Sequence, residues 1–399
     1  MKLRGPVLVF LADALVLPVG LLTVVLLSRL WGPADYGLYG LALSITLWLE
    51  WFVVALFGGV GLQMMARDPQ AEDVANFLLQ ANMAAGTAAA LLLAGAAPLL
   101  AVEPLRSLLW LGALMLPLAG AGQAHRARLT VLEQFSVRAG GVGLKMLVRV
   151  LGMLAVLHWE GGVFAGIAVF PVAGLIEVFF YRFWVRTKWW GGRGSVRLPL
   201  RSAAAYLVFM GSQRLVERLD LLLLRALGFP LAEVGMYAAA QSVALPPALL
   251  GNSYASTVQT RVHLAENREA GRRAGWKAMA VGMSTLPGAL VAVYLAEPLV
   301  ALAYGPKFYG TAALVAPLLL AGTLHGTSTL ASATLQGLGH VRWTSVLSVA
   351  QVVVTASALL VVVPRYGAAG AAWTWCASAG LAAGVGALLL RRSKYTVGV

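Results

Sequence analysis

Twelve long apolar stretches constrain this chain more than any other feature of its sequence. A helix needs about 20 mostly apolar residues to cross the hydrocarbon core of a bilayer, and each stretch is close to that length. Only 12% of the 399 residues are charged and the mean hydropathy is +0.80, whereas a soluble domain has about 25% charged residues. We therefore predict an all-α polytopic membrane protein with about 12 transmembrane helices. The predicted spans are 6–28, 38–66, 74–101, 105–124, 140–158, 162–185, 203–226, 232–258, 275–296, 309–336, 342–363 and 367–390.

Two short segments repeat each other half a chain apart. Residues 32–39 read GPADYGLY and residues 230–237 read PLAEVGMY, so an acidic residue, a glycine and a tyrosine recur at an offset of 198. This order predicts parallel repeats related by an axis along the membrane normal, that is, two pseudo-symmetric six-helix bundles. The predicted parts are an N-terminal six-helix lobe at 1–185, a cytoplasmic linker at 186–202 and a C-terminal six-helix lobe at 203–399.

The repeated segment itself is interpreted as a tight turn at the outer face rather than as a ligand site. Pro33 fixes its own φ and ends a helix, while Gly32 and Gly37 permit backbone angles that other residues resist. The rings of Tyr36 and Tyr39 are expected to lie in lipid with their hydroxyls in water. Both copies then serve as topology markers.

Lysine and arginine are unevenly distributed between the two sides of the predicted spans. With the N-terminus placed in the cytoplasm, most of them fall in cytoplasmic loops, which is the positive-inside pattern. That pattern explains most of the net charge of +14 without a nucleic-acid partner. An even number of helices puts both termini in the cytoplasm, so we predict a multi-pass protein of the cytoplasmic (inner) membrane. Cys376 is the only cysteine, which excludes an intramolecular disulfide, and neither a cofactor nor a metal is predicted.

Basic residues inside the spans are the strongest functional signal, because a charge at mid-helix costs ~2.5–3.5 kcal/mol on insertion scales. Lys145 and Arg149 lie on one face of the fifth span, and Arg214 and Arg218 on one face of the seventh, since residues four apart differ by only about 40° around a helix. Two such stripes facing water would bind a phosphate or pyrophosphate, which arginine matches bidentately. The alternative is internal ion pairing, for example of Arg214 with Glu217.

Three intramembrane carboxylates are candidates for ion coupling or for charge pairing. They are Asp13 in the first span, Glu50 in the second and Asp220 in the seventh. A lone carboxylate in the membrane can move a proton or sodium ion, or it can neutralise a nearby arginine. Glu177 in the sixth span is a further candidate for charge pairing. None of the five histidines has an acidic or nucleophilic partner at a suggestive spacing.

Four segments carry a family resemblance. They are 29–39 (RLWGPADYGLY), 297–309 (EPLVALAYGPKFY), 335–340 (LQGLGH) and 363–370 (VPRYGAAG). The first is similar to the first periplasmic turn of the polysaccharide and oligosaccharide flippases (Wzx-like), a family of the multidrug/oligosaccharidyl-lipid/polysaccharide exporter superfamily. The second resembles the turn between helices nine and ten of that family, and the last two resemble its C-terminal landmarks, in the expected order.

The resemblance implies a flippase with a cationic translocation cavity. Its cargo would be a polyprenyl-pyrophosphate-linked oligosaccharide, moved across the cytoplasmic membrane by alternating access for cell-surface polysaccharide biosynthesis. The implied partners are the lipid-linked oligosaccharide, the bilayer, H⁺ or Na⁺ as a coupling ion, and glycan polymerase machinery.

Three other functions compete with this one. A cation-coupled multidrug exporter of the same superfamily is the alternative, although a cavity for organic cations needs carboxylates and aromatic rings, and basic residues outnumber acidic ones in these spans. A lipid II flippase is a closely related option. An enzyme is not expected, because the predicted outer loops are too short to hold a catalytic region.

Overall fold

The computed structural model describes residue 8, residues 11–12, 15–67, 72–100, 103–185 and 200–393. Throughout these ranges the regular secondary structure is helical, which confirms the predicted all-α class. The chain forms two compact units, Met1–Arg214 and Leu215–Val399. The boundary falls inside helix α9 (Leu200–Ala226). Asp13 and most of the predicted linker, 186–199, lie outside the described residues.

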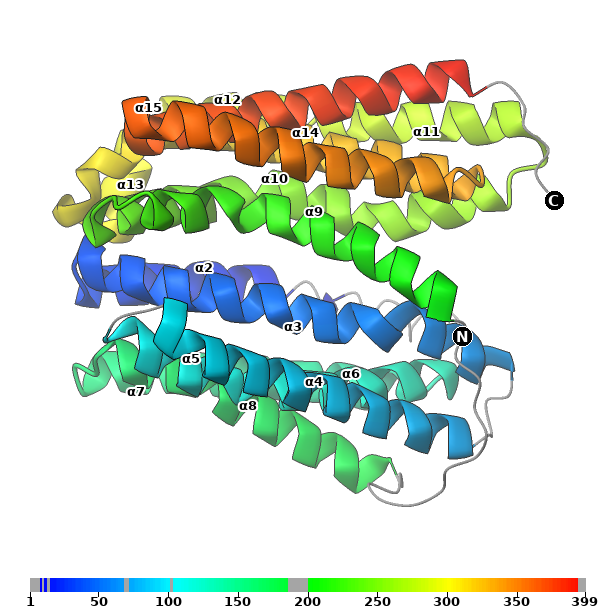
Figure 1. Ribbon diagram of the computed structural model, residues 1–399, viewed down its shortest axis with the longest axis horizontal. Helices are drawn as coiled ribbons and strands as arrows, with labels where there is room; N and C mark the ends of the chain where they lie inside the picture. The colour runs from blue at the N-terminus through cyan, green and yellow to red at the C-terminus, as the bar shows by residue number, and fades with distance from the viewer. Residues whose placement is uncertain are drawn as a thin grey trace. The chain divides into compact units, whose positions relative to one another are not determined.

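The described part of the first unit has six long helical segments before α9, and Figure 1 shows how they are arranged. One of them is broken at Leu114 into α5 and α6, so the predicted span 105–124 is a bent segment that runs on to Val131. This longer course matters for the site, because it brings Arg126 into the helix. The helices are α2 (Val16–Leu30), α3 (Pro33–Arg67), α4 (Glu72–Leu100), α5 (Leu105–Ala113), α6 (Met115–Val131), α7 (Phe135–His158) and α8 (Val163–Trp184).

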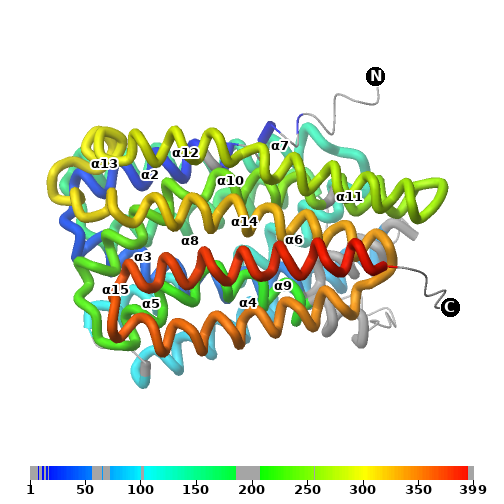
Figure 2. The backbone as a smooth tube through the Cα atoms, turned by 90° about the horizontal axis from the view of Figure 1, so that it is seen from above, coloured from blue at the N-terminus to red at the C-terminus, as the bar shows by residue number. Residues whose placement is uncertain are grey.

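The second unit begins with the end of α9 and closes with the longest helix of the chain. α15 folds back on itself at Gly367, where φ is 55°, so it consists of two antiparallel arms, as Figures 1 and 2 show. These arms correspond to the predicted spans 342–363 and 367–390. The other helices are α10 (Leu231–His263), α11 (Arg268–Met283), α12 (Leu286–Tyr294), α13 (Ala296–Tyr304), the short 3₁₀ helix η1 (Pro306–Thr311) and α14 (Ala312–Gly337), and α15 is Val341–Arg392.

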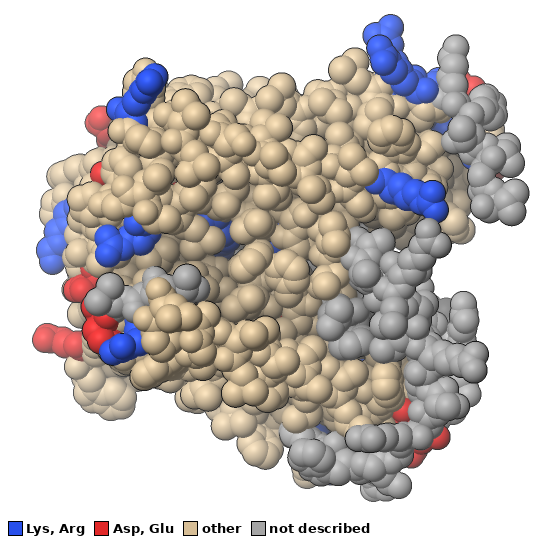
Figure 3. All heavy atoms as spheres, in the orientation of Figure 1, with Lys and Arg blue, Asp and Glu red and all other residues tan. Residues whose placement is uncertain are grey.

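Eight helical stretches of the described chain are long and apolar enough to cross a membrane. α15 counts once among them, although its two arms are each of crossing length. α9 is not among them, because Arg214, Glu217, Arg218 and Asp220 fall within two turns of it. On the face drawn in Figure 3, uncharged side chains cover most of the middle of each unit, and charged ones gather mainly toward the helix ends. The chain is therefore a polytopic membrane protein, as predicted.

The repeated segment begins a helix in both units instead of forming the turn itself. α3 starts at Pro33 and α10 at Leu231, so Asp35 and Glu233 each lie in a first helical turn. A carboxylate there is favoured by the positive end of the helix dipole. The backbone freedom expected of Gly37 is not used, since the positive-φ glycines of the described chain lie elsewhere.

The tyrosines of the repeat are buried, so their predicted place at the lipid–water boundary is wrong. Tyr36 and Tyr39 are each 3% exposed. The ring of Tyr39 packs edge-on against Trp31, at 5.5 Å between centroids, and against Phe170 of α8 at 6.4 Å. Packing against neighbouring helices of the same unit, which the local sequence does not encode, replaces the expected contact with lipid.

The region of the repeat fastens the last helical hairpin of its own unit. In the first unit the indole Nε1 of Trp31 donates to the carbonyl of Gly161, between α7 and α8, at 3.0 Å. In the second unit Glu233 Oε1 accepts from the backbone N–H of Ala368 at 2.8 Å, next to the fold-back at Gly367. Both copies therefore bond the start of their helix region to the last hairpin of the unit, one through an indole N–H and the other through a carboxylate.

Small residues let the helices of the second unit approach closely. Gly251 of α10 and Gly326 of α14 are so near each other that a Cβ on either would meet the backbone of the other helix. Such pairs are typical of helix contacts in membranes, where close backbone packing replaces hydrophobic burial as the driving force. This contact fixes the position of His325, the neighbour of Gly326.

Candidate functional site

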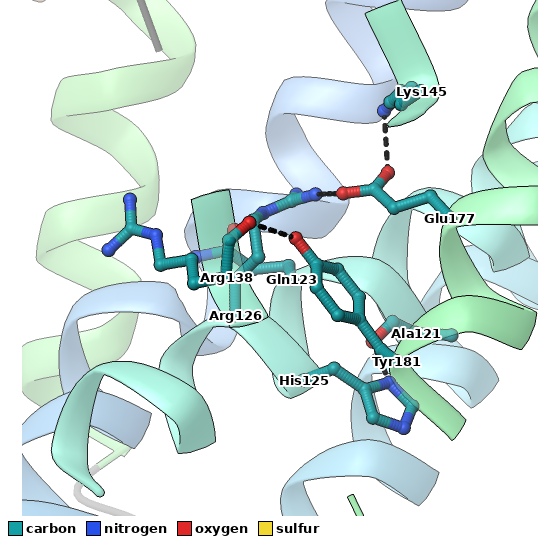
Figure 4. Close-up of polar contacts among 8 residues, drawn as sticks. All are labelled: Ala121, Gln123, His125, Arg126, Arg138, Lys145, Glu177 and Tyr181. Carbon is teal, nitrogen blue, oxygen red and sulfur yellow. Dashed lines mark hydrogen bonds and ion pairs between the residues drawn. The ribbon is translucent and has the colours of Figure 1, made fainter. Parts of the chain in front are cut away.

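A buried carboxylate in the first unit holds two cations. Glu177 of α8 is 1% exposed. One of its oxygens receives the guanidinium of Arg126 from α6, and the other lies 2.9 Å from the Nζ of Lys145 on α7. Arg126 also donates to the side-chain oxygen of Gln123 at 3.2 Å. Figure 4 shows both cations pointing at Glu177 from separate helices.

The sequence of α6 makes room for this cluster. Residues 119–122 are Ala-Gly-Ala-Gly, and all four are buried. A Cβ on Gly122 would lie 3.4 Å from Glu177 Oε2, and one on Gly120 would press into the backbone of Asn82 in α4. Larger side chains would push α4 and α8 away, so the small residues bring three helices to the point where the charges meet.

Arg149 lies one turn beyond Lys145 on α7 and has a different environment. Its guanidinium carbon stands 4.3 Å from the centroid of the Phe170 ring, a cation–π contact. Glu50 of α3 is close enough to act electrostatically on both Arg149 and Arg126. The Nε of Arg149 is buried without a hydrogen-bond partner among the described residues. The predicted pair Lys145 and Arg149 is thus one residue bound to a carboxylate and one stacked on a ring.

Arg214, at the end of the first unit, stacks on a tryptophan of the same unit. Its guanidinium carbon is 4.0 Å from the centroid of the half-exposed Trp51 ring. The neighbouring Phe52 touches the same helix, since a Cβ on Gly211 would lie 2.6 Å from its ring. α3 therefore presents two adjacent aromatic rings to α9.

Arg218, in the second unit, contacts a neutral amide. It donates to Gln241 Oε1 on α10 at 3.2 Å, and Gln241 in turn donates to the backbone carbonyl of Glu217 at 2.9 Å. The side chain of Glu217 turns to α14, where its Oε1 lies 3.1 Å from His325 Nε2.

Asp220, one of the predicted coupling residues, accepts a hydrogen bond on each of its carboxylate oxygens. It is 1% exposed. One carboxylate oxygen accepts from the hydroxyl of Tyr237, the tyrosine of the second repeat, and the other accepts from the backbone N–H of Leu221 at 2.7 Å. The remaining two predicted carboxylates differ from it: Glu50 lies near the cations described above, and Asp13 falls outside the described residues.

Two parts of this arrangement were not singled out by the sequence. Arg126 lies beyond the predicted span 105–124, because the apolar run stops at 124 while the helix continues to Val131. The contact between Glu217 and His325 joins residues 108 positions apart, and no spacing rule detects such a pair. In the part of the chain described, no group of three or more His, Cys, Asp or Glu side chains could hold a metal ion.

The partly buried charges gathered around Glu177 include more cations than carboxylates. Glu177 balances one of the three cations Arg126, Lys145 and Arg149, and Glu50 acts on two of them from α3. Guanidinium and ammonium groups in a low-dielectric setting attract anions strongly, and phosphate oxygens match the arginine fork. The chemistry suited to this site is the binding of an anionic group.

Solved structures of transporters share this fold. A structure described as "Lipid II flippase MurJ, inward closed conformation" matches with a TM-score of 0.77 at 12% identity, over 98% of this chain and 88% of that one. A multidrug resistance MATE family transporter of the MOP superfamily matches in its inward-facing conformation with a TM-score of 0.69 at 16% identity, over 95% and 94%. A structure described as the outward-facing conformation of a multidrug resistance MATE family transporter matches with a TM-score of 0.64 at 16% identity, over 96% of this chain and 94% of that one.

The chain therefore shares its fold with these transporters. No curated protein sequence matches the chain. The family described as "Polysaccharide biosynthesis protein" matches residues 26–313, and the chain belongs to that family. The predicted resemblance to the flippases of this superfamily is confirmed.

Proposed function

We propose that the protein flips a polyprenyl-pyrophosphate-linked oligosaccharide across the cytoplasmic membrane by alternating access, for cell-surface polysaccharide biosynthesis. The observation that carries the proposal is the excess of partly buried positive charge between packed helices of the first unit, from Arg126, Lys145 and Arg149. Intramembrane cations are costly, and their presence marks a substrate path. A pyrophosphate carries the opposite charge and oxygens that arginine binds bidentately.

Arg149 and Arg218 are the cations with which we expect the cargo to interact first. Each has a neutral contact, the Phe170 ring or the Gln241 amide, so no carboxylate has to be displaced from either. Lys145 and Arg126 are held by Glu177. For these two, phosphate binding is an exchange of one anion for another.

The similarities to known proteins support a flippase or exporter of a lipid-linked substrate. Membership of a polysaccharide biosynthesis family and a fold shared with a lipid II flippase both fit a lipid-linked sugar as cargo. The match to inward-facing and outward-facing structures of one transporter class fits alternating access. With this function, the protein is a carrier and not an enzyme, its termini face the cytoplasm, and glycan polymerase machinery uses its product.

A cation-coupled multidrug exporter is the second candidate, because the MATE transporters share the fold. An organic cation would have to enter a site in which Arg126, Lys145 and Arg149 repel it. Asp13→Asn and Glu50→Gln test this reading by comparing drug resistance with glycan export. If either variant abolished resistance and left glycan export untouched, the exporter would become the better assignment.

The decisive experiment measures the surface glycan in cells that lack every other flippase of this kind. We expect Arg149→Ala and Arg218→Ala each to reduce export by about tenfold or more, since a charge-assisted hydrogen bond contributes about 1.5–3 kcal/mol. Arg149→Ala with Arg214→Ala should abolish it. The matched control is Arg273→Ala, an exposed arginine paired with Glu269 on α11, which should export normally. Normal export by the double variant at normal protein levels would contradict the proposal.

A further inference from the structure

A histidine and a glutamate meet inside the second unit. His325 of α14 is 1% exposed, and its Nε2 lies 3.1 Å from Oε1 of Glu217 on α9, whose side chain is 14% exposed. The carboxylate accepts the Nε2–H, which fixes the ring orientation and leaves Nδ1 as the second nitrogen. The backbone contact between Gly326 and α10 holds this part of α14 in place.

The far side of the histidine ring carries unused hydrogen-bonding capacity. His325 Nδ1 is buried without a hydrogen-bond partner among the described residues, and so is the indole Nε1 of Trp375 on α15. The two rings are 6.2 Å apart between centroids. Buried polar atoms without partners cost free energy, so each of them calls for an explanation. Here one of them is the nitrogen to which a proton would add.

Other ionisable groups lie on the helices around Glu217 and His325, and those nearest in the chain have other partners. Arg218 on α9 contacts Gln241 of α10, and Asp220 is bonded to Tyr237. On α14 itself, His325 is the only ionisable side chain. The remaining groups on the packed elements are Arg214 and Arg225 on α9, Glu233, Tyr254, Arg261 and His263 on α10, Arg268, Glu269, Arg272, Arg273 and Lys277 on α11, Tyr294 on α12, Glu297 and Tyr304 on α13, Lys307 and Tyr309 on η1, and Arg342, Arg365, Tyr366, Cys376, Arg391 and Arg392 on α15.

We propose that Glu217 and His325 form a proton-binding site in the second unit. One proton adds to Nδ1 of His325 while Nε2–H continues to donate to Glu217, so the pair changes from a net charge of −1 to an imidazolium–carboxylate pair of net charge zero. No other bond forms or breaks. Glu217 is next to Arg218 in the chain, so protonation increases the positive field that α9 offers to an anion.

This second step rests on the proposed function, because it links the proton to an anionic head group bound near Arg218. Two ligands that alter one local charge affect each other's affinity by the same factor. The proton site by itself does not require that function, so the two parts can be tested separately.

Nuclear magnetic resonance of the intact protein in nanodiscs, labelled with ¹⁵N at histidine, tests the proton site. The chain has five histidines, and His325→Gln identifies the signal. We expect that signal to change when a proton adds to the ring, and we expect the midpoint of the change to move in Glu217→Gln. His125, equally buried but bonded to the carbonyl of Ala121 at 2.8 Å, is the matched control and should keep its midpoint. A His325 signal that does not titrate, or whose midpoint ignores Glu217→Gln, overturns the proton site. If Glu217→Gln folds poorly, Glu217→Asp replaces it, because the shorter carboxylate keeps the charge but moves it away from His325. The midpoint of the His325 signal should move in this variant too.

Calorimetric titration with inorganic pyrophosphate tests the coupling. For each protein, the pyrophosphate affinity at a pH where His325 is protonated is divided by the affinity at a pH where it is neutral. We expect this ratio to be at least about fivefold larger in the unmodified protein than in His325→Gln, since fivefold is the lower limit of typical coupling. That variant sees the same change in pyrophosphate ionisation, so it isolates the contribution of the protein. Equal pH dependence in both proteins overturns the coupling. Absence of pyrophosphate binding at every pH counts against the proposed function, while the resonance experiment still decides the proton site.

Discussion

Glu177 is the residue on which the charge cluster of the first unit depends. Its carboxylate is buried and meets Arg126 and Lys145 from two other helices. An ion pair in such a setting is costly to break on one side only, because the remaining charges stay buried and uncompensated. The corresponding exposed pair, Glu269 with Arg273, loses little when it is broken, since water solvates both groups.

We predict that Glu177→Gln lowers the free energy of unfolding by roughly 3–5 kcal/mol, the usual cost of breaking a buried pair. The matched change Glu269→Gln should cost at most about 1 kcal/mol. Thermal unfolding of both variants in the same detergent measures the difference. If both variants lost the same free energy of unfolding, Glu177 would not be needed to compensate the charges of Arg126 and Lys145.

Glu103 gives a pH-dependent prediction outside the membrane. The Ser107 hydroxyl donates to its carboxylate at 2.7 Å and Arg106 donates at 2.8 Å, and these bonds lower the pKa of Glu103 below its ordinary value of 4.5. The charged form is therefore favoured by folding, so its contribution is complete above pH 4.5 and is lost as the pH falls through the lowered pKa.

We expect hydrogen exchange in the first turn of α5 to accelerate, beyond its intrinsic pH dependence, as the pH falls below 4.5. Glu103→Gln should show no such acceleration, because it has no carboxylate to protonate. The effect is small, since the carboxylate is exposed to solvent. An identical pH profile in both proteins would contradict this account.

Sequence reasoning at the residue scale identified residue types better than partners. Lys145, Arg149, Arg214 and Arg218 were found because a charge in an apolar run is conspicuous. Their contacts, however, come from other helices: Glu177 lies 32 positions from Lys145, and Gln241 lies 23 from Arg218. Helical periodicity relates residues on one helix only, so it cannot say which neighbouring helix faces a given charge.

At the scale of single elements, the fold-back of α15 depends on a glycine. Gly367 has a φ of 55°, and a Cβ there would lie 2.6 Å from Glu233 Oε1 and 3.3 Å from the ring of Phe229. Any other residue would meet both a backbone penalty and a clash with the start of α10. Phe229 stands at the same offset of 198 from Trp31 as the rest of the repeat, and both rings lie near the last hairpin of their unit.

We predict that Gly367→Ala destabilises the protein by about 1–3 kcal/mol, the usual cost of a residue held in a glycine-only conformation. Gly384→Ala, in the second arm of the same helix, meets no atom within 4 Å and should be neutral or slightly stabilising, since alanine is the better helix former. Thermal unfolding compares them. If Gly384→Ala proved the more harmful of the two, the fold-back could not be the sensitive point.

The helices themselves were largely predictable, because apolar length alone reports a membrane crossing. Both arms of α15 were anticipated from the break around residues 364–366, although the chain continues as helix up to the fold-back. The repeated segment was misread in its detail. A proline at the start of a helix and a glycine inside one resemble a turn in sequence, and only burial distinguishes Tyr36 and Tyr39 from interfacial anchors.

At the scale of the whole molecule, the orientation in the membrane is a prediction of charge distribution. The single cysteine, Cys376, is buried, so Cys376→Ser gives a background for site-specific labelling. Lys307 and Arg273 are both exposed and are predicted to lie on opposite sides, the first outside and the second in the cytoplasm.

We expect a membrane-impermeant maleimide to label Lys307→Cys in intact cells. Arg273→Cys should be labelled only after the cells are permeabilised. The reverse pattern would place the termini outside and would require the proposed direction of transport to be reconsidered.

The ion pairs of Glu177 have a consequence for the turnover of a carrier. A transporter that delivers its cargo must return without it, and bare cations crossing an apolar region would make that return slow. An internal carboxylate that occupies Arg126 and Lys145 keeps the unloaded protein closer to electrical neutrality. Under the proposed function, the cargo would compete with this carboxylate for Arg126 and Lys145, which would weaken its binding and speed its release. In this arrangement, Glu177 would determine how fast the unloaded carrier returns to its starting conformation.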